Sequence, residues 1–234
     1  MEPRTTRETD GVRVAIIVPA YNEEDRLETV VQACQGSRIA DEIIVVSDGS
    51  KDRTAEVASR IAGIRVVELR TNVGKGGAMA AGVHSTDAEI VVFIDADLGG
   101  LTGRHIDAII EPVYYGLCDM AVGVFRGGKV WSDAAQRISP ALSGQRAMRR
   151  ALFLAVPEVT SLRMGIEIAL TQTARRRRAK VKRVVLRGVS NTHKEQKLGL
   201  VKGLAARTKM YREITKAMVR TRRPKRRRRR RFLG

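Results

Sequence analysis

Residues 91–97 read Val-Val-Phe-Ile-Asp-Ala-Asp and carry the clearest indication of the fold of this chain. Four apolar residues suited to a buried strand lead directly into two carboxylates, Asp95 and Asp97. Because side chains alternate along a strand, we expect both carboxylates to project from one face at the strand's C-terminal edge. Two adjacent acids repel each other unless a cation lies between them, and hard oxygen ligands favour Mg²⁺ or Mn²⁺. The pair is therefore a candidate metal site, with two solvated turn residues as the alternative.

The composition indicates one globular domain followed by a strongly basic tail. The chain has 234 residues, of which 43% are hydrophobic, and a net charge of +19. Ten Lys or Arg and no acid lie between residues 220 and 231, so we expect residues 220–234 to be disordered when free. Residues 1–11 are expected to form a flexible, polar N-terminus without an apolar signal core. With only two cysteines and no CxxC spacing, we expect a reduced, cytoplasmic protein without a transmembrane helix.

Apolar, β-branched runs alternate with segments of helical spacing through the first half of the chain. The expected strands are residues 12–18, 42–46, 64–69 and 90–94. The expected helices are residues 25–33, 54–61 and 78–83. Strands that alternate with helices predict βαβ units, so the fold class is α/β with a mostly parallel sheet flanked by helices. Ligands of such folds bind at the C-terminal ends of the strands.

The second half of the chain is less regular. The expected strands are residues 119–124 and 181–189, the expected helices are residues 147–155 and 165–176, and residues 127–143 are expected to form a loop or lid. In residues 200–219, apolar side chains recur at intervals of three, four and seven, and basic side chains occupy much of the remaining surface. That pattern predicts a basic amphipathic helix that runs into the arginine-rich tail.

Polar motifs follow each of the first four expected strands. They read Pro-Ala-Tyr-Asn-Glu-Glu at 19–24, Ser-Asp-Gly-Ser-Lys-Asp at 47–52, Asn-Val-Gly-Lys-Gly-Gly-Ala at 72–78, and Asp-Ala-Asp at 95–97. Each motif alone is compatible with an ordinary turn, but four at successive strand ends favour one shared ligand site. Asp48 can accept hydrogen bonds from a ligand, Gly74 permits close backbone approach, and Lys75 can offset negative charge.

Together these motifs resemble the family 2 glycosyltransferases with the GT-A fold, a Rossmann-like nucleotide-diphospho-sugar transferase fold. The resemblance is strong over residues 14–101 and looser to about residue 200. It implies a domain at 12–199, divided into a nucleotide-sugar half at 12–101 and an acceptor half at 102–199. The implied reaction moves one sugar from a UDP- or GDP-sugar.

The resemblance also implies roles for the donor-side residues. The base and ribose would lie near Pro19, Tyr21 and Glu23. Asp48 would accept the ring N–H of uracil or of guanine, and Lys75 would offset the charge of the diphosphate. The Asp-x-Asp motif of the family, which holds the divalent ion that bridges the diphosphate, corresponds to Asp95, Ala96 and Asp97.

Residues 142–150, Leu-Ser-Gly-Gln-Arg-Ala-Met-Arg-Arg, resemble the Ser-Gly-Phe-Arg-x-x-Arg-Arg stretch of the dolichol-phosphate mannosyltransferase-like branch. Arginines of that stretch face the phosphates of donor and lipid acceptor, which implies this role for Arg146 and Arg149. The alternative is a pair of surface charges on a helix. The branch follows its Asp-x-Asp with Leu-Gln, whereas this chain has glycine at position 99. A side chain near the metal is therefore missing at Gly99.

Two further residues are candidates by their positions. Glu167 is an acid inside an apolar helical run, and it resembles the acceptor-side carboxylate of the family, a candidate general base. The alternative is an ion pair on a helix face, and a phosphate acceptor would need no base. His193 follows the last expected strand, where many GT-A enzymes place a third metal ligand, which implies a set with Asp95 and Asp97. The alternative is an exposed loop histidine.

The basic C-terminal region has three interpretations: an anchor on an anionic membrane, a nucleic-acid ligand, or a solvated end. Aromatic residues make up only 4% of the chain and no nucleic-acid recognition motif is present, so we favour the membrane surface, through residues 200–231. This predicts a peripheral protein at the inner face of the cell membrane, with polyprenyl phosphate as acceptor. The alternatives are a small acidic acceptor, as in glucosyl-phosphoglycerate synthases, a nucleotidyltransferase, or a non-catalytic nucleotide-sugar-binding module.

Overall fold

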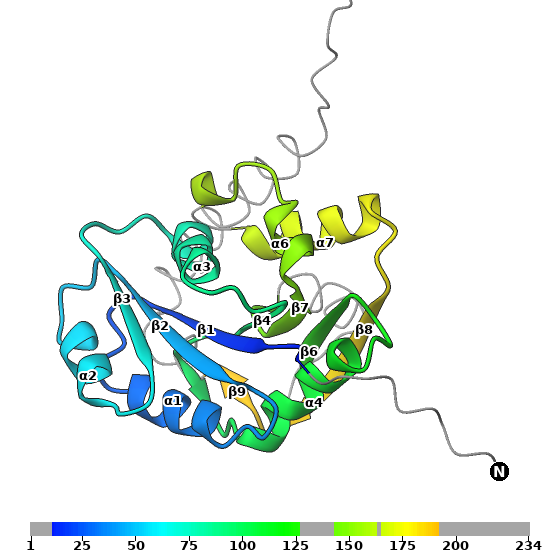
Figure 1. The fold of residues 1–234 in the computed structure, drawn as a ribbon. Coiled ribbons are helices and arrows are strands. Elements are labelled where there is room, and N and C mark those ends of the chain that lie inside the picture. Colours follow the sequence, from blue (N-terminus) through cyan, green and yellow to red (C-terminus); the bar gives the residue numbers. More distant parts are fainter. Residues whose placement is uncertain (1–10, 127–142, 163–164, 192–234) are drawn as a thin grey trace, which may run out of the picture.

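A seven-stranded sheet forms the centre of the computed structural model, which describes residues 11–126, 143–162 and 165–191. The strand order is β3-β2-β1-β4-β7-β6-β8 (Figure 1). The strands are β1 (Val14–Ala20), β2 (Glu42–Asp48), β3 (Arg65–Leu69), β4 (Ile90–Phe93), β6 (Met120–Arg126), β7 (Arg146–Arg149) and β8 (Val181–Arg187). In this sheet β7 runs antiparallel to β4 and β6, and the other pairings are parallel. The expected α/β class with a mostly parallel sheet is confirmed.

Helices cover both faces of the sheet (Figure 1). One face carries α1 (Leu27–Gln35), α2 (Thr54–Arg60) and α4 (Gly103–Tyr114); the other carries α3 (Lys75–His84), α6 (Arg150–Leu154) and α7 (Ile166–Arg176). Side chains of β1 alternate between the two cores: Val14, Ile16 and Val18 face α1 and α4, whereas Ile17 faces α3. Because both faces are buried at the centre of the sheet, β1, β2 and β4 contain continuous apolar runs rather than alternating ones.

The helix expected at 147–155 is wrong over its first residues. Residues 146–149 form β7 between β4 and β6, and α6 begins only at Arg150. Ala147 belongs to one core and Met148 to the other, so this short segment is buried on both faces. Such a segment lacks the alternation of polar and apolar residues that marks a half-exposed strand. Its sequence pattern therefore does not distinguish it from the start of a helix.

Helix α4 was not expected from the sequence. Its buried residues Ile106, Ile109, Ile110 and Val113 follow the spacing of a helix face, so the signal was present. Pro112 lies in its last turn and argued against a helix, since proline removes a backbone donor.

The chain beyond β4 leaves the sheet earlier than expected. β4 ends at Phe93, and the Ile94 N–H still donates to the Ile17 carbonyl at 3.1 Å. Asp95 and Asp97 therefore lie beyond the strand, and the expectation that strand alternation directs both carboxylates to one face does not apply to them. After them, β5 (Leu98–Gly99) pairs antiparallel with β9 (Ser190–Asn191).

Several expectations fall on residues outside those described. These are the flexible N-terminus up to residue 10, the loop at 127–142, His193, the amphipathic helix at 200–219 and the tail at 220–234. Within the described ranges, none of the helices has the length and apolar character needed to cross a membrane.

Candidate functional site

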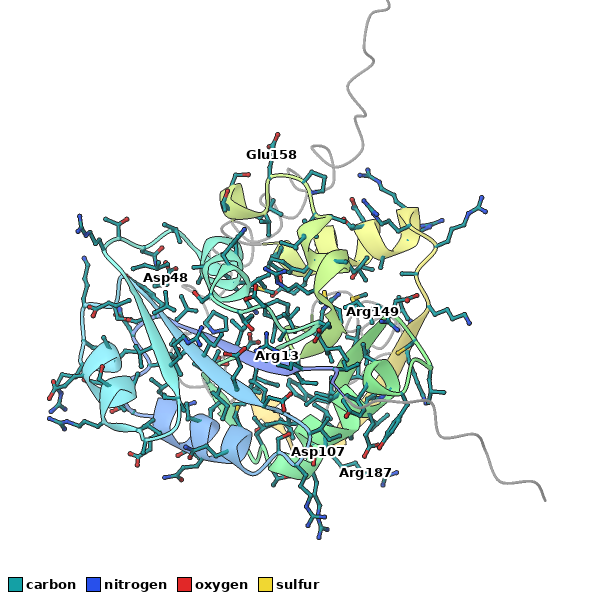
Figure 2. The ribbon with its side chains drawn as sticks, viewed as in Figure 1. Arg13, Asp48, Asp107, Arg149, Glu158 and Arg187 are labelled. Atoms are coloured by element: carbon teal, nitrogen blue, oxygen red, sulfur yellow. The ribbon has the colours of Figure 1, made fainter. Side chains whose placement is uncertain are left out.

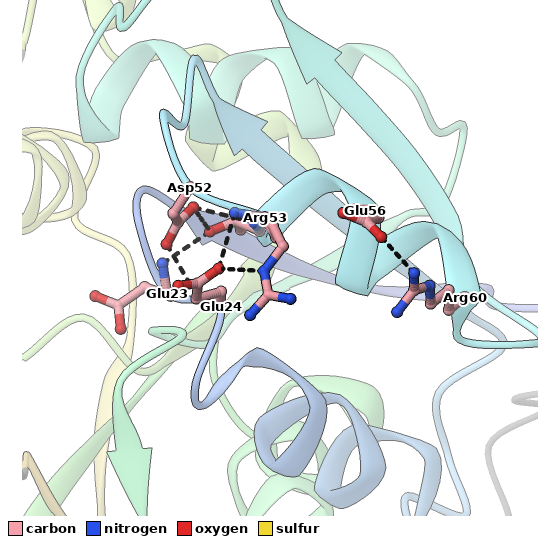
Figure 3. Close-up of polar contacts among 7 residues, drawn as sticks. Glu23, Glu24, Asp52, Arg53, Glu56 and Arg60 are labelled. Atoms are coloured by element: carbon pink, nitrogen blue, oxygen red, sulfur yellow. Dashed lines mark hydrogen bonds and ion pairs between the residues drawn. The ribbon is translucent and has the colours of Figure 1, made fainter.

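The loops that follow β1 and β2 are joined by reciprocal hydrogen bonds (Figure 3). The Glu23 N–H donates to Thr54 Oγ1 at 2.8 Å, and the Glu24 N–H donates to Asp52 Oδ2 at 3.2 Å. In return, the Arg53 N–H donates to Glu24 Oε2 at 3.0 Å. These bonds therefore hold the first motif against the second at the C-terminal edge of the sheet.

Asp48, at the end of β2, anchors the third motif. Its side chain is only 3% exposed. The Val73 N–H donates to Asp48 Oδ1 at 2.8 Å and the Gly74 N–H donates to Oδ2 at 2.9 Å. Gly74 has φ +87°, a left-handed conformation that favours glycine, and the next residue, Lys75, begins α3. Asp48 thus holds the loop that positions Lys75.

Lys75 joins two acids that come from distant parts of the chain. Its Nζ lies 2.6 Å from Asp95 Oδ1, just beyond β4, and 2.7 Å from Glu167 Oε1, in the first turn of α7. Burial alone would lower the pKa of Lys75, but the two carboxylates outweigh that effect and raise its pKa. The structure therefore brings together Lys75, Asp95 and Glu167, which the sequence assigned to three separate roles.

Gln145 belongs to the site and was missed in the sequence. Its Nε2 donates to Asp95 Oδ2 at 2.8 Å, so each oxygen of that carboxylate has a different partner. The sequence gave no signal for this role, because the resembled Ser-Gly-Phe-Arg stretch has a phenylalanine at the position of Gln145 and therefore assigns it no polar contact.

Arg146 supports the site from inside the protein. Its side chain is 1% exposed; Nε donates to the Ser143 carbonyl at 2.8 Å and Nη1 donates to Thr171 Oγ1, on α7, at 3.0 Å. Burial lowers the pKa of Arg146 to about 10, and the nearby carboxylates of Glu167 and Asp95 act in the opposite direction. The guanidinium ties the segment before β7 to α7.

The structure does not bring Arg149 to this cluster. In β7, Arg146 pairs with Phe93 at the C-terminal end of β4, whereas Arg149 pairs with Ile90 at its start. The side chain of Arg149 is 53% exposed and lies 3.7 Å from Asp119. Figure 2 shows Arg149 far from Asp48. A helix would have placed the two arginines one turn apart, but a strand separates them along the sheet.

The remaining candidate residues lie at or near the same edge. Pro19 is the penultimate residue of β1 and pairs with Val46 of β2, and Tyr21, just after β1, is 42% exposed. Ala96 is buried, and Asp97 is half-buried in the turn before β5. Among the described residues there is no group of three His, Cys, Asp or Glu that could hold a metal ion.

These features define an α/β domain with a polar site at the C-terminal edge of a mostly parallel sheet. Residues 15–165 match the model of Glycosyl transferase family 2. The chain therefore belongs to that family, and its fold is the expected GT-A fold.

Solved structures and curated relatives agree with this assignment. Glucosyl-3-phosphoglycerate synthase from Mycobacterium tuberculosis, solved with Mn²⁺, UDP and phosphoglyceric acid, superposes with a TM-score of 0.72 at 25% identity, over 90% of this chain and 78% of that chain. A dolichyl-phosphate beta-glucosyltransferase of Drosophila melanogaster is 39% identical over 105 residues, which are 38% of this chain and 32% of the relative.

A bacterial relative matches a longer stretch. Undecaprenyl-phosphate 4-deoxy-4-formamido-L-arabinose transferase of Pseudomonas fluorescens is 30% identical over 154 residues, which are 62% of this chain and 44% of the relative. The match therefore spans less than half of the length of either curated relative.

Proposed function

We propose that this chain transfers a single sugar from a UDP- or GDP-sugar to a phosphate-bearing acceptor, with the help of Mg²⁺ or Mn²⁺. The observation that carries the proposal is the contact of one lysine with two acids. Lys75 lies 2.6 Å from Asp95, the first acid of the Asp-x-Asp motif, and 2.7 Å from Glu167, the acceptor-side candidate. Donor-side and acceptor-side groups of a sugar transferase must meet at the reacting carbon, and this cluster supplies such a meeting point.

The donor nucleotide would lie across the first three motifs. Pro19, Tyr21 and Glu23 would contact the base and ribose, with exposed Tyr21 offering a ring face. We propose that Asp48 acts on the donor mainly through the loop it anchors, because both of its oxygens accept backbone N–H groups. That loop positions Lys75, whose charge would offset that of the diphosphate.

The residues present fit a divalent cation. Asp95 and Asp97 supply the hard oxygen donors that Mg²⁺ and Mn²⁺ prefer, and few protein ligands suffice when phosphates complete the shell. The pairing of Leu98 with Asn191 brings the chain beside the Asp-x-Asp segment two residues before His193, which supports His193 as a third ligand. When bound, the ion would stabilise the negative charge that grows on the leaving nucleotide.

Glu167 would serve the acceptor side. For a hydroxyl acceptor, its carboxylate is the candidate that removes the proton. For a phosphate acceptor, which is already a nucleophile, Glu167 would instead hold Lys75 in place through the 2.7 Å contact. Arg146, buried beneath the cluster, would keep the segment before β7 and α7 together, and the proposal gives Arg149 no part in catalysis.

A lipid-linked acceptor is our first choice. The names of the two curated relatives above each combine a sugar transferase with a polyprenyl phosphate, dolichyl phosphate in one and undecaprenyl phosphate in the other. Eight Lys or Arg and no acid lie between residues 175 and 187, all eight with exposed side chains at the end of α7 and along β8. Together with residues 200–231, this charge supports peripheral binding to an anionic membrane at the cytoplasmic face.

A small acidic acceptor is the second candidate, favoured by the likeness to the phosphoglycerate-binding structure over 90% of this chain. Both candidates share the donor, the metal and the Lys75 cluster, and they differ only in the acceptor. Family membership favours either of them over a nucleotidyltransferase.

A two-acceptor transfer assay tests the proposal. The full chain is incubated with Mn²⁺ and sugar-labelled UDP-glucose or GDP-mannose, and offered polyprenyl phosphate in phosphatidylglycerol vesicles or 3-phosphoglycerate in solution. We expect Mn²⁺-dependent label in the lipid phase, and loss of vesicle binding at high salt. Label in the aqueous product alone would favour the second candidate. Intact donors with every acceptor, despite tight nucleotide binding, would contradict sugar transfer and favour a binding module.

A further inference from the structure

The carboxylate of Asp95 lies in a cradle formed by Ser143, Gly144 and Gln145, the three residues just before β7. Gln145 is 1% exposed, and its Nε2 donates to Asp95 Oδ2 at 2.8 Å. The other oxygen, Oδ1, faces Lys75 Nζ at 2.6 Å. The cradle thus contacts one side of the carboxylate and leaves the other turned toward the charged cluster.

The orientation of the Gln145 amide follows from its neighbours. A carboxylate oxygen only accepts, so the group that faces Asp95 Oδ2 must be the amide NH₂. The amide Oε1 then lies 3.1 Å from Ser143 Oγ, which can donate to it. The single proton of the Ser143 hydroxyl is shared between this amide oxygen and the Gly123 carbonyl in β6, so Ser143 links the amide to β6.

Gly144 allows the carboxylate to lie directly against the backbone of the cradle. A Cβ atom at position 144 would lie 2.5 Å from Asp95 Oδ1 and 2.7 Å from Asp95 Cγ, closer than real contacts allow. The cradle therefore combines a donor on one residue with the absence of a side chain on the residue before it.

We propose that Gln145 is a positioning residue that sets the direction of the Asp95 carboxylate toward the metal. This rests on the proposed function. The sequence lacks the glutamine expected at position 99, directly after the Asp-x-Asp motif, and Gln145 delivers an amide to the same carboxylate from a segment 50 residues further along. Gln145 therefore acts by holding Asp95, and it does not take the place of a side chain at position 99.

The test compares Mn²⁺ binding by Gln145→Met and the wild-type chain. Methionine is unbranched and similar in size, so it fills the space while removing the amide. We expect the Mn²⁺ dissociation constant, measured by electron paramagnetic resonance with UDP or GDP present, to rise by about 10- to 100-fold, as is usual when a group that orients a metal ligand is lost. The Mn²⁺ concentration needed for half-maximal transfer should rise in parallel, whereas kcat at saturating Mn²⁺ should change by less than about threefold.

Two further variants guard against a purely structural effect. Gln35→Met is the matched control, because Gln35 Nε2 also donates one hydrogen bond, to the Ala62 carbonyl at 2.8 Å, on the far side of the domain; it should leave Mn²⁺ binding unchanged. Ser143→Ala frees only the other end of the amide and should weaken Mn²⁺ binding by a smaller factor. If Gln145→Met fails to fold, the Ser143→Ala result decides.

The outcomes separate this inference from the proposed function. If the wild-type chain binds Mn²⁺ with UDP or with GDP and both cradle variants bind it equally well under the same condition, the positioning role is overturned and the function stands. If the wild-type chain binds no Mn²⁺ with either UDP or GDP, both are overturned.

Discussion

Replacing Lys75 with methionine is expected to slow sugar transfer by roughly a hundredfold or more. Lys75 is the cation that contacts both Asp95 and Glu167, and removal of one group that stabilises charge in an active site typically costs on this scale. Stability should fall as well, because two carboxylates would remain without the charge between them. We expect a loss of about 2 kcal/mol, less than the cost for a fully buried pair because Lys75 keeps 28% exposure.

A double variant tests whether the lost stability arises from the two acids. Lys75→Met combined with Glu167→Gln removes the cation and one of the two negative charges. Urea denaturation should show the double variant to be more stable than Lys75→Met alone, while transfer stays low. Lys180→Met, an exposed lysine after α7, is the matched control and should change stability by less than about 0.5 kcal/mol. Near wild-type activity in Lys75→Met would contradict the role of the cluster.

Replacing Gly144 with alanine is expected to have the second large effect. The added Cβ would overlap the carboxylate of Asp95, which must then turn away from its present position. We expect donor turnover to fall by at least roughly tenfold, since misplacement of a group that holds the reacting geometry by about 1 Å costs up to about a hundredfold. The measurement is Mn²⁺-dependent release of UDP from UDP-glucose, together with the melting temperature.

Gly36→Ala provides the control for the glycine substitution. Gly36 ends α1 with φ −75°, and its added Cβ would come no closer than 3.3 Å to a neighbouring atom. Turnover by Gly36→Ala should therefore match the wild type. If Gly144→Ala also kept full turnover, the expectation that turnover requires the close packing of Asp95 against Gly144 would be contradicted.

The fold was predictable because the central strands β1, β2 and β4 are buried on both faces. Continuous apolar runs at β1, β2 and β4, each followed by a polar motif and a helical segment, leave few alternatives to a parallel sheet. The prediction failed where a segment is too short to show a period. Residues 146–149 are strand rather than helix, and only their pairing with β4 and β6 reveals this.

The candidate site was predictable where residues follow strand ends. Asp48 is the last residue of β2, whereas Lys75 and Asp95 follow β3 and β4, and parallel strands bring those positions to one edge. Contacts from the reversed strand β7 were not predictable. Gln145 reaches Asp95 because β7 starts at the same edge where β4 ends, and no spacing in the sequence encodes that antiparallel pairing.

Burial also changed the interpretation of two charged residues. Asp48 and Arg146 both suggested contact with a ligand, yet each lies inside the protein with hydrogen bonds to neighbouring segments. A buried charge requires such partners, and sequence does not show whether the partner is a ligand or the backbone.

The central proposal, that Asp95 and Asp97 would hold a divalent cation together with a nucleotide diphosphate, has a direct test in ligand-induced thermal stabilisation. UDP and GDP are each added with Mn²⁺ or with a chelator to the wild-type chain and to Asp97→Asn. At a ligand concentration about 100 times the dissociation constant, the wild-type melting temperature should rise by roughly 5–10 °C with Mn²⁺. We predict that Asp97→Asn keeps only the metal-independent part of this rise. An identical Mn²⁺-dependent rise in Asp97→Asn would contradict the claim.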